Sequence, residues 1–136
     1  AKAGDATAYM KRTTLPKGYV DPKNSSYSDS STGQVSVNWA DATNFDERLE
    51  KIITQKWIAL YPNGMEAWAE FRRTGFPKLF PINENSNDPS IDKNKQIRRV
   101  IFPKSEYANN AGAVNAATRL LGGPDSGGTR LWWDAR

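Results

Sequence analysis

The side chains most able to perform catalysis in this sequence are two pairs of carboxylates. Asp46 and Glu50 stand four residues apart. Glu66 and Glu70 have the same spacing, which places both members of a pair on one face of a helix. Such pairs supply the acid and the base or nucleophile of glycoside hydrolases. Lysines and arginines lie close to both pairs, however, and this favours solvated, ion-paired helix faces over a catalytic centre.

The composition excludes several other kinds of catalysis. The 136 residues include no cysteine and no histidine. Thiolate nucleophiles, disulfides, serine–histidine triads and histidine–zinc sites are therefore impossible within this chain. The formal net charge is +4, but basic residues never stand more than two in succession, so no nucleic-acid partner is expected. We assign no catalytic residue and expect no cofactor.

Two polar stretches resemble ion or phosphate sites only superficially. Residues 83–88 are rich in the oxygen ligands that calcium prefers, but they lack the ligand spacing of an EF-hand loop. We expect a solvated loop there and no metal. Residues 122–128 are rich in glycine but lack the Gly-Lys-Ser/Thr of a phosphate-binding loop, so no phosphate site is expected.

The five tryptophans divide between core and ligand roles. Trp57 and Trp68 fall on apolar helix faces and are expected in the core. Trp132 and Trp133 are adjacent and cannot both point inward from a regular strand, so one is expected to anchor the chain and the other to be available to a ligand. Aromatic rings that face solvent can stack on sugars. The candidate ligand-binding residues are Tyr19, Tyr27, Trp39 and Trp133.

Two helices are expected to carry the carboxylate pairs. Asn44 can cap the first helix, with Glu47 in the capping-box position. Asn63 and Glu66 repeat this pattern, and Gly75 provides a stop for the second helix. We therefore predict a hairpin of helices over residues 44–61 and 64–74. The apolar face of the first helix is expected to comprise Phe45, Leu49, Ile52, Ile53, Trp57 and Leu60.

The rest of the chain is less regular. A short helix is expected over residues 5–12, a short strand over 35–39, and an extended segment over 97–103. A third helix is expected over residues 111–121, capped by Asn110. The fold class predicted is mainly α with long irregular loops.

Several ordered sequence blocks resemble those of SusD/RagB-type proteins. Residues 50–61 resemble a helix near the C-terminal end of that family. Residues 66–77 are similar to its E-a-W-x-e-x-R-R-T-G-x-P block, and residues 98–107 to its R-R-x-x-Y-P-x-s-E block, with Phe102 where tyrosine is common. Asn109, Asn110, Val114 and the segments 122–125 and 131–134 resemble the closing part. The resemblance covers residues 44–134, and more loosely residues 9–39.

The resemblance implies a position within a larger fold. Residues 1–136 would form the C-terminal portion of a SusD-like α-helical fold whose N-terminal half contains tetratricopeptide-like helix pairs. Within it we expect a loop-rich lead-in over residues 1–43 and a helical hairpin over 44–75. Residues 76–136 would form an irregular region with one short helix.

The resemblance also implies a function. Such proteins are surface lipoproteins of Bacteroidota, anchored in the outer membrane by a lipidated N-terminus. They capture glycans or peptides without catalysis and deliver them to a TonB-dependent, SusC-like transporter. The expected partners are that transporter, the glycan or peptide ligand and the N-terminal part of the same protein. The alternative is a fragment of a secreted glycoside hydrolase that uses a carboxylate pair.

Apolar residues are scarce for a self-sufficient domain. They make up 38% of the sequence, against about 45–50%, counting glycine, in a typical soluble domain. Residues 22–38 and 83–96 contain almost no apolar side chains, so they bury little and do not offset an ordering cost of about 1–2 kcal/mol per residue. We therefore expect that the chain alone forms no stable monomer, and that the helix over residues 44–61 presents apolar surface that another segment covers.

Overall fold

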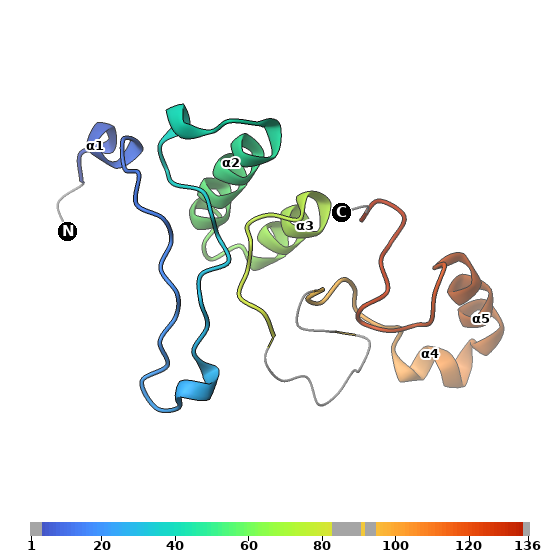
Figure 1. The fold of residues 1–136 in the computed structure, drawn as a ribbon. Coiled ribbons are helices and arrows are strands. Elements are labelled where there is room, and N and C mark those ends of the chain that lie inside the picture. Colours follow the sequence, from blue (N-terminus) through green and yellow to red (C-terminus); the bar gives the residue numbers. More distant parts are fainter. Residues whose placement is uncertain (1–3, 83–90, 92–94, 135–136) are drawn as a thin grey trace. The chain divides into compact units, whose positions relative to one another are not determined.

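The computed structural model describes residues 4–82, 91 and 95–134. It divides into two compact units, Ala1–Phe80 and Pro81–Arg136, each of which is described by itself. Within the described residues the named elements are all helical, and a single isolated bridge is the only β pairing (Figure 1). The predicted fold class, mainly α with long irregular segments, is confirmed.

The first unit begins with α1 (Ala6–Met10), whose N-cap Asp5 accepts a hydrogen bond from the Thr7 backbone N–H. This confirms the short helix expected over residues 5–12. The Tyr9 hydroxyl of α1 donates to the Gln55 side chain at 2.9 Å, which attaches this helix to the longer helix that follows.

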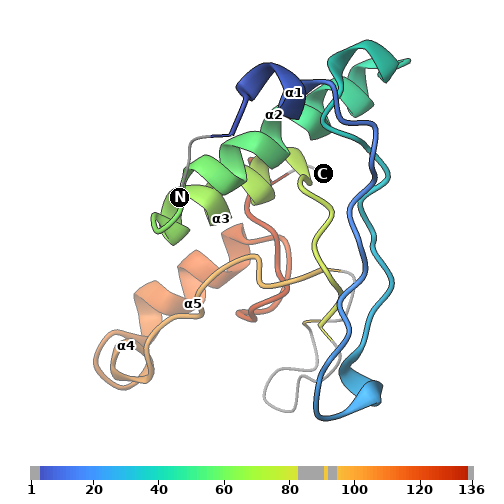
Figure 2. The ribbon, with the colours of Figure 1, turned by 90° about the vertical axis from the view of Figure 1, so that its left-hand side faces the viewer.

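Residues 13–37 then form a long loop, whose two arms run side by side in both views (Figures 1 and 2). The short 3₁₀ helix η1 (Ser25–Tyr27) lies at the turn between the arms. Near the turn, Tyr19 and Asp29 exchange backbone hydrogen bonds of 2.9 and 3.0 Å. Gly18 is required beside this pair, because a Cβ there would stand 2.6 Å from the Asp29 carbonyl oxygen.

The strand predicted over residues 35–39 is wrong. Trp39 instead starts the 3₁₀ helix η2 (Trp39–Asp41), and Asn38 caps it by accepting from the Ala40 backbone N–H. Ser36 also bonds locally, since its hydroxyl donates to Asp41 at 2.6 Å. Short polar side chains that bond the nearby chain compete with strand pairing, and alternation over five residues is too weak a signal to outweigh them.

The predicted helical hairpin is confirmed as α2 (Phe45–Ala59) and α3 (Gly64–Thr74). Asn44 accepts from the Glu47 backbone N–H at 2.9 Å, as predicted. The Glu47 carboxylate reaches one residue beyond the cap and accepts from the Thr43 backbone N–H and hydroxyl. Asn63 caps α3 by accepting from the Glu66 N–H, and Gly75 ends it in the left-handed region.

The burial of α2 differs from the face predicted for it. Ile53 is buried, as expected, but Glu50 and Lys51 are buried beside it while Phe45 and Ile52 are exposed. The long loop covers this side of the helix, where the Lys51 ammonium donates to the Ser36 carbonyl at 2.8 Å. Helical periodicity identifies an apolar stripe but does not reveal which side a neighbouring segment covers.

The described residues of the second unit contain two helices, α4 (Lys104–Asn109) and α5 (Ala111–Leu120), where one was expected. The shorter helix is polar and lacks an apolar stripe, so its sequence pattern gave no signal. Asn110 stands at the N-cap position of α5 but makes no side-chain cap. Its amide donates instead to Glu106 at 3.4 Å, so the capping role predicted for Asn110 is wrong.

Two buried carboxylates hold the second unit together. Asp125 pairs with the Arg99 guanidinium and accepts from the Phe102 backbone N–H. Asp134 pairs with Arg98 at 3.2 Å, and both side chains are almost fully buried. The backbone N–H groups of both arginines donate to the Gly127 carbonyl. The Arg-Arg block and the glycine-rich loop therefore have a structural role.

Candidate functional site

The Glu66 and Glu70 carboxylates are held by cations. The Lys56 ammonium lies 3.3 Å from Glu66 and 3.4 Å from Glu70. The Arg73 guanidinium donates two hydrogen bonds to Glu70, at 3.0 and 2.8 Å, and this contact lowers the pKa of Glu70. A carboxylate that stays ionised at neutral pH is unsuited to donate a proton as a general acid. The ion-paired interpretation of this pair is confirmed.

The second carboxylate pair does not present two groups to solvent. Asp46 is exposed on α2, but Glu50 is only 8% exposed, so the solvated position expected for Glu50 is wrong. Burial raises the pKa of Glu50, while the nearby Lys78 ammonium opposes this effect. The two carboxylates therefore occupy different environments and do not line one open cleft.

Two of the four predicted ligand residues lie near the turn of the long loop. Tyr19 is half exposed, its hydroxyl donates to Asp21 at 2.9 Å, and its ring centroid lies 6.5 Å from that of Phe80. The hydrogen bond to Asp21 raises the pKa of Tyr19. Tyr27 ends η1 and is also partly exposed.

The other two predicted residues belong to other segments of the chain. Trp39 is half exposed in η2. The preceding Asn38 donates its backbone N–H to the Arg12 carbonyl, which joins the two arms at the end of the loop opposite its turn, so Trp39 does not join Tyr19 and Tyr27 in one site. Trp133 belongs to the second unit and is half-buried, whereas its neighbour Trp132 is 93% exposed. A ligand role for any of these four residues stays a prediction.

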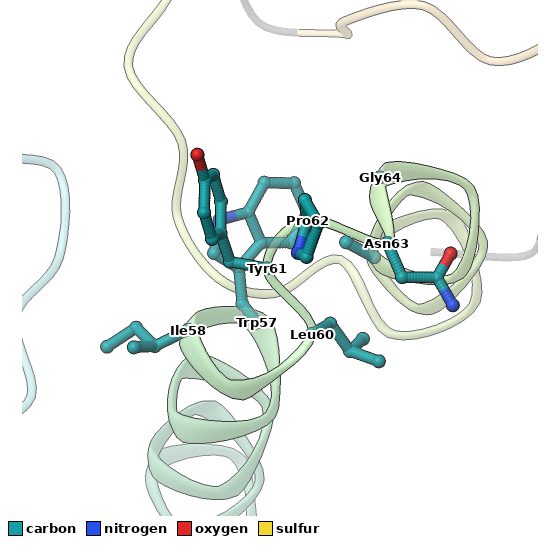
Figure 3. A pocket seen from close by; sticks show the side chains of 8 residues that line it. Trp57, Ile58, Leu60, Tyr61, Pro62, Asn63 and Gly64 are labelled. Atoms are coloured by element: carbon teal, nitrogen blue, oxygen red, sulfur yellow. The ribbon is translucent and has the colours of Figure 1, made fainter.

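The turn between α2 and α3 forms an aromatic hollow that sequence reasoning did not identify. Its volume is about 580 Å³. Figure 3 shows the Trp57 indole behind the rings of Tyr61 and Pro62, with Ile58 and Leu60 directed to opposite sides. Trp57 is half-buried rather than in the core, and Tyr61 is 89% exposed. The lining residues are Trp57, Ile58, Leu60, Tyr61, Pro62, Asn63, Gly64 and Ala67.

The chemistry of this aromatic hollow suits an apolar contact better than a sugar. Asn63 contributes the main polar side chain, and its carbonyl oxygen already caps α3. Sugar sites combine an apolar surface with several convergent polar groups. Trp57 on the apolar stripe, followed by Tyr61-Pro62, is the sequence signal that could have identified this surface. Trp68, also expected in the core, is likewise only half-buried. It stacks with Arg72, whose guanidinium carbon lies 3.6 Å from the ring centroid.

Two further features concern metals and membranes. Within residues 4–82, 91 and 95–134, no group of three or more acidic side chains is arranged to hold a metal ion. The oxygen-rich stretch 83–88 lies outside the described residues. None of the helices described is long and apolar enough to span a membrane.

One family of known proteins matches nearly the whole chain. The model of the family described as SusD-like, "Susd and RagB outer membrane lipoprotein", matches residues 1–134. The chain belongs to the SusD-like family. The predicted resemblance to SusD/RagB-type proteins is thereby confirmed.

Solved SusD homologues share this fold closely. A chitin-binding SusD homologue from Flavobacterium johnsoniae is 43% identical and superposes with a TM-score of 0.88 over 98% of this chain. SusD homologues from Bacteroides thetaiotaomicron and Bacteroides vulgatus are 40% and 42% identical, with TM-scores of 0.88 and 0.84 over 98% and 97% of this chain. No curated protein matches the chain.

The SusD-like chain is short beside these relatives. It covers 28% of the Flavobacterium johnsoniae protein, 30% of the Bacteroides thetaiotaomicron protein and 27% of the Bacteroides vulgatus protein. What the whole relatives bind is therefore a property of much longer chains.

Proposed function

We propose that this SusD-like chain is part of a non-catalytic protein that captures a glycan at the bacterial outer-membrane surface. The description of the family as outer membrane lipoproteins supports the location. The chitin-binding relative, 43% identical, supports a glycan ligand. Chitin oligosaccharides are therefore the first ligands to test.

The observation that carries the non-catalytic role is the state of Glu70. Two hydrogen bonds from Arg73 and the nearby Lys56 ammonium hold its carboxylate in the charged form. A glycoside hydrolase requires one carboxyl group of its pair as a proton donor and the other as a carboxylate. Here the same Lys56 ammonium also lies 3.3 Å from Glu66, so both members are ion-paired. This arrangement supports binding over the alternative of a secreted glycoside hydrolase.

The captured glycan would pass to a TonB-dependent, SusC-like transporter. This step rests on family membership, and the protein would be held at the cell surface by a lipid anchor on its N-terminal part. The aromatic hollow has a different partner in this proposal, the N-terminal part of the same protein. Three apolar side chains at the hairpin are exposed, which supports the proposal that the N-terminal part covers this surface. They are Ile58, Tyr61 and Met65.

The binding and hydrolysis hypotheses differ in the fate of the ligand. The whole protein is incubated with chitin oligosaccharides, and the sugars are sized by mass spectrometry. We expect the oligosaccharides to keep their original length. Shorter products that form with the wild type and disappear with Glu66→Gln or Glu70→Gln would contradict the proposal and support the hydrolase. Glu106→Gln, a carboxylate exchange in the second unit, is the matched control.

A further inference from the structure

A small cavity in the first unit lies between α2, the long loop and the segment after α3. Its volume is about 160 Å³, far more than the roughly 10–15 Å³ that one water needs. It is smaller than the roughly 300–1,000 Å³ of sites for drug-sized ligands. The polar and aromatic side chains that line it include Lys17, Ser31, Glu50, Thr54, Lys78 and Phe80. The space suits one small ring rather than an oligosaccharide.

Glu50 is the unusual member of this lining. Its side chain is buried, yet among the described residues it makes no hydrogen bond and no ion pair within 4.0 Å. Its nearest charged influences are the Lys78 and Lys51 ammonium groups, which attract it without a direct contact. The carboxylate borders the cavity, so a ligand in that space can supply the hydrogen bonds that the protein does not.

A neighbouring hollow provides a comparison for Glu50. That second hollow, of about 150 Å³, is also lined by charged groups, including Asp41, Glu47 and Lys51. There the Lys51 ammonium donates to Asp41 and to the Ser36 carbonyl, and Glu47 accepts from Thr43. The charges of the second hollow are therefore satisfied within the protein, whereas the Glu50 carboxylate makes no such contact among the described residues.

The lining of the Glu50 cavity carries charges of both signs, and each sign repels one class of ion. Lys17 and Lys78 carry ammonium groups on exposed side chains at its edge, and these repel a cation. The Glu50 carboxylate repels an anion. A neutral polyol can donate hydroxyl hydrogens to Glu50 and accept from the ammonium groups. Phe80 adds an aromatic wall, which suits the apolar face of a sugar ring.

We propose that the Glu50 cavity binds one neutral sugar residue of the glycan that the whole protein captures. This inference rests on the proposed function and adds a location and a ligand class to it. The Glu50 carboxylate can accept hydrogen bonds from the hydroxyls of such a sugar.

Three sugars that differ in charge test the proposal directly. The whole protein is titrated with glucose, glucosamine and glucuronate, and with N-acetylglucosamine as a second neutral sugar. Amide hydrogen exchange is followed in the segments that contain Ser31 and Glu50. We expect a neutral sugar to slow exchange in both segments, and the charged analogues to bind at least about tenfold more weakly. Equal or stronger protection by either charged sugar would overturn the proposal.

A conservative substitution separates this inference from the proposed function. Glu50→Gln keeps the shape of the side chain but removes its charge, and we expect it to weaken binding of chitin oligosaccharides about tenfold. Asp46→Asn, one turn earlier on α2 and outside the cavity, is expected to bind like the wild type. If Glu50→Gln binds like the wild type, this inference fails and the proposed function stands. If the wild type binds no glycan, both fail.

The hydrogen-exchange result on the wild type keeps the test decisive if Glu50→Gln fails to fold. Protection at the segments with Ser31 and Glu50 supports the cavity as the site. Oligosaccharide binding without protection at either segment overturns it.

Discussion

Replacing Asp125 with alanine should destabilise the second unit locally. The carboxylate pairs with Arg99, and both side chains are only 7% exposed. It also accepts from the Phe102 backbone N–H at 3.1 Å and from the Tyr107 hydroxyl at 2.6 Å. The substitution therefore leaves a buried guanidinium and a backbone donor without this partner.

The magnitude follows from these contacts. Removing one member of a buried ion pair costs about 3–5 kcal/mol, and an unsatisfied buried donor costs about 1–3 kcal/mol. These costs overlap, because both groups can relax toward water once the carboxylate is gone. We expect a loss of about 4 kcal/mol, which corresponds to roughly thousandfold faster hydrogen exchange when the segment opens locally.

Hydrogen exchange with mass spectrometry on the whole protein measures this effect by segment. We expect acceleration in the peptide that contains Arg99 and Phe102 and no change in the peptides of α2. Tyr107→Phe removes a single contact at the exposed end of the same carboxylate and serves as a milder comparison. If the peptide that contains Arg99 and Phe102 exchanges no faster in Asp125→Ala than in Tyr107→Phe, the contacts of Asp125 do not stabilise this unit as argued.

Three further predictions concern pH, capping and independence. Burial alone raises the pKa of Asp125, but hydrogen bonds from Tyr107 and Arg99 outweigh this effect and lower the pKa overall. The stabilisation by Asp125 is therefore present above the unfolded-state pKa of about 4 and is lost as pH falls through the folded-state pKa. Faster hydrogen exchange in the Phe102 peptide at decreasing pH will detect this loss. Asn44→Ala removes the α2 cap and should cost about 1 kcal/mol, whereas Asn44→Ser should retain most of the stability in thermal unfolding. Residues 1–136 expressed alone should show no single cooperative melt as a monomer, and a sharp transition with monomeric sedimentation would refute the need for a covering segment.

The helices that could be predicted from sequence are those specified by local signals. Asn44 and Asn63 each bond a backbone N–H three residues along the chain, and Gly75 supplies the left-handed stop. These interactions involve only neighbours in sequence, so their residue types suffice. The polar helix α4 lacks such signals apart from the preceding Pro103, and it was missed.

The candidate sites were harder to predict because they depend on distant segments. Glu50 looked like a solvated carboxylate, but the long loop and the segment after α3 enclose it. Lys51 is buried for the same reason, since its partners Ser36 and Asp41 lie at the end of the loop and in η2. The spacing of residues along α2 does not reveal where that loop lies.

The aromatic residues show a similar limit. The adjacent pair Trp132 and Trp133 was expected to divide between an anchored and a free ring, and the structure exposes Trp132 while half-burying Trp133. Alternation in an irregular segment does not determine which of the two faces solvent. The residue chosen from sequence was the more buried one.

The most direct measurement of the central claim is equilibrium binding of chitin oligosaccharides to the whole, folded protein by isothermal titration calorimetry, with the ligand recovered afterwards. We predict saturable binding and recovery of the oligosaccharide at its original length. No saturable binding of chitin oligosaccharides or any other glycan, or recovery of shortened sugars, would contradict the account of a non-catalytic glycan-capturing protein.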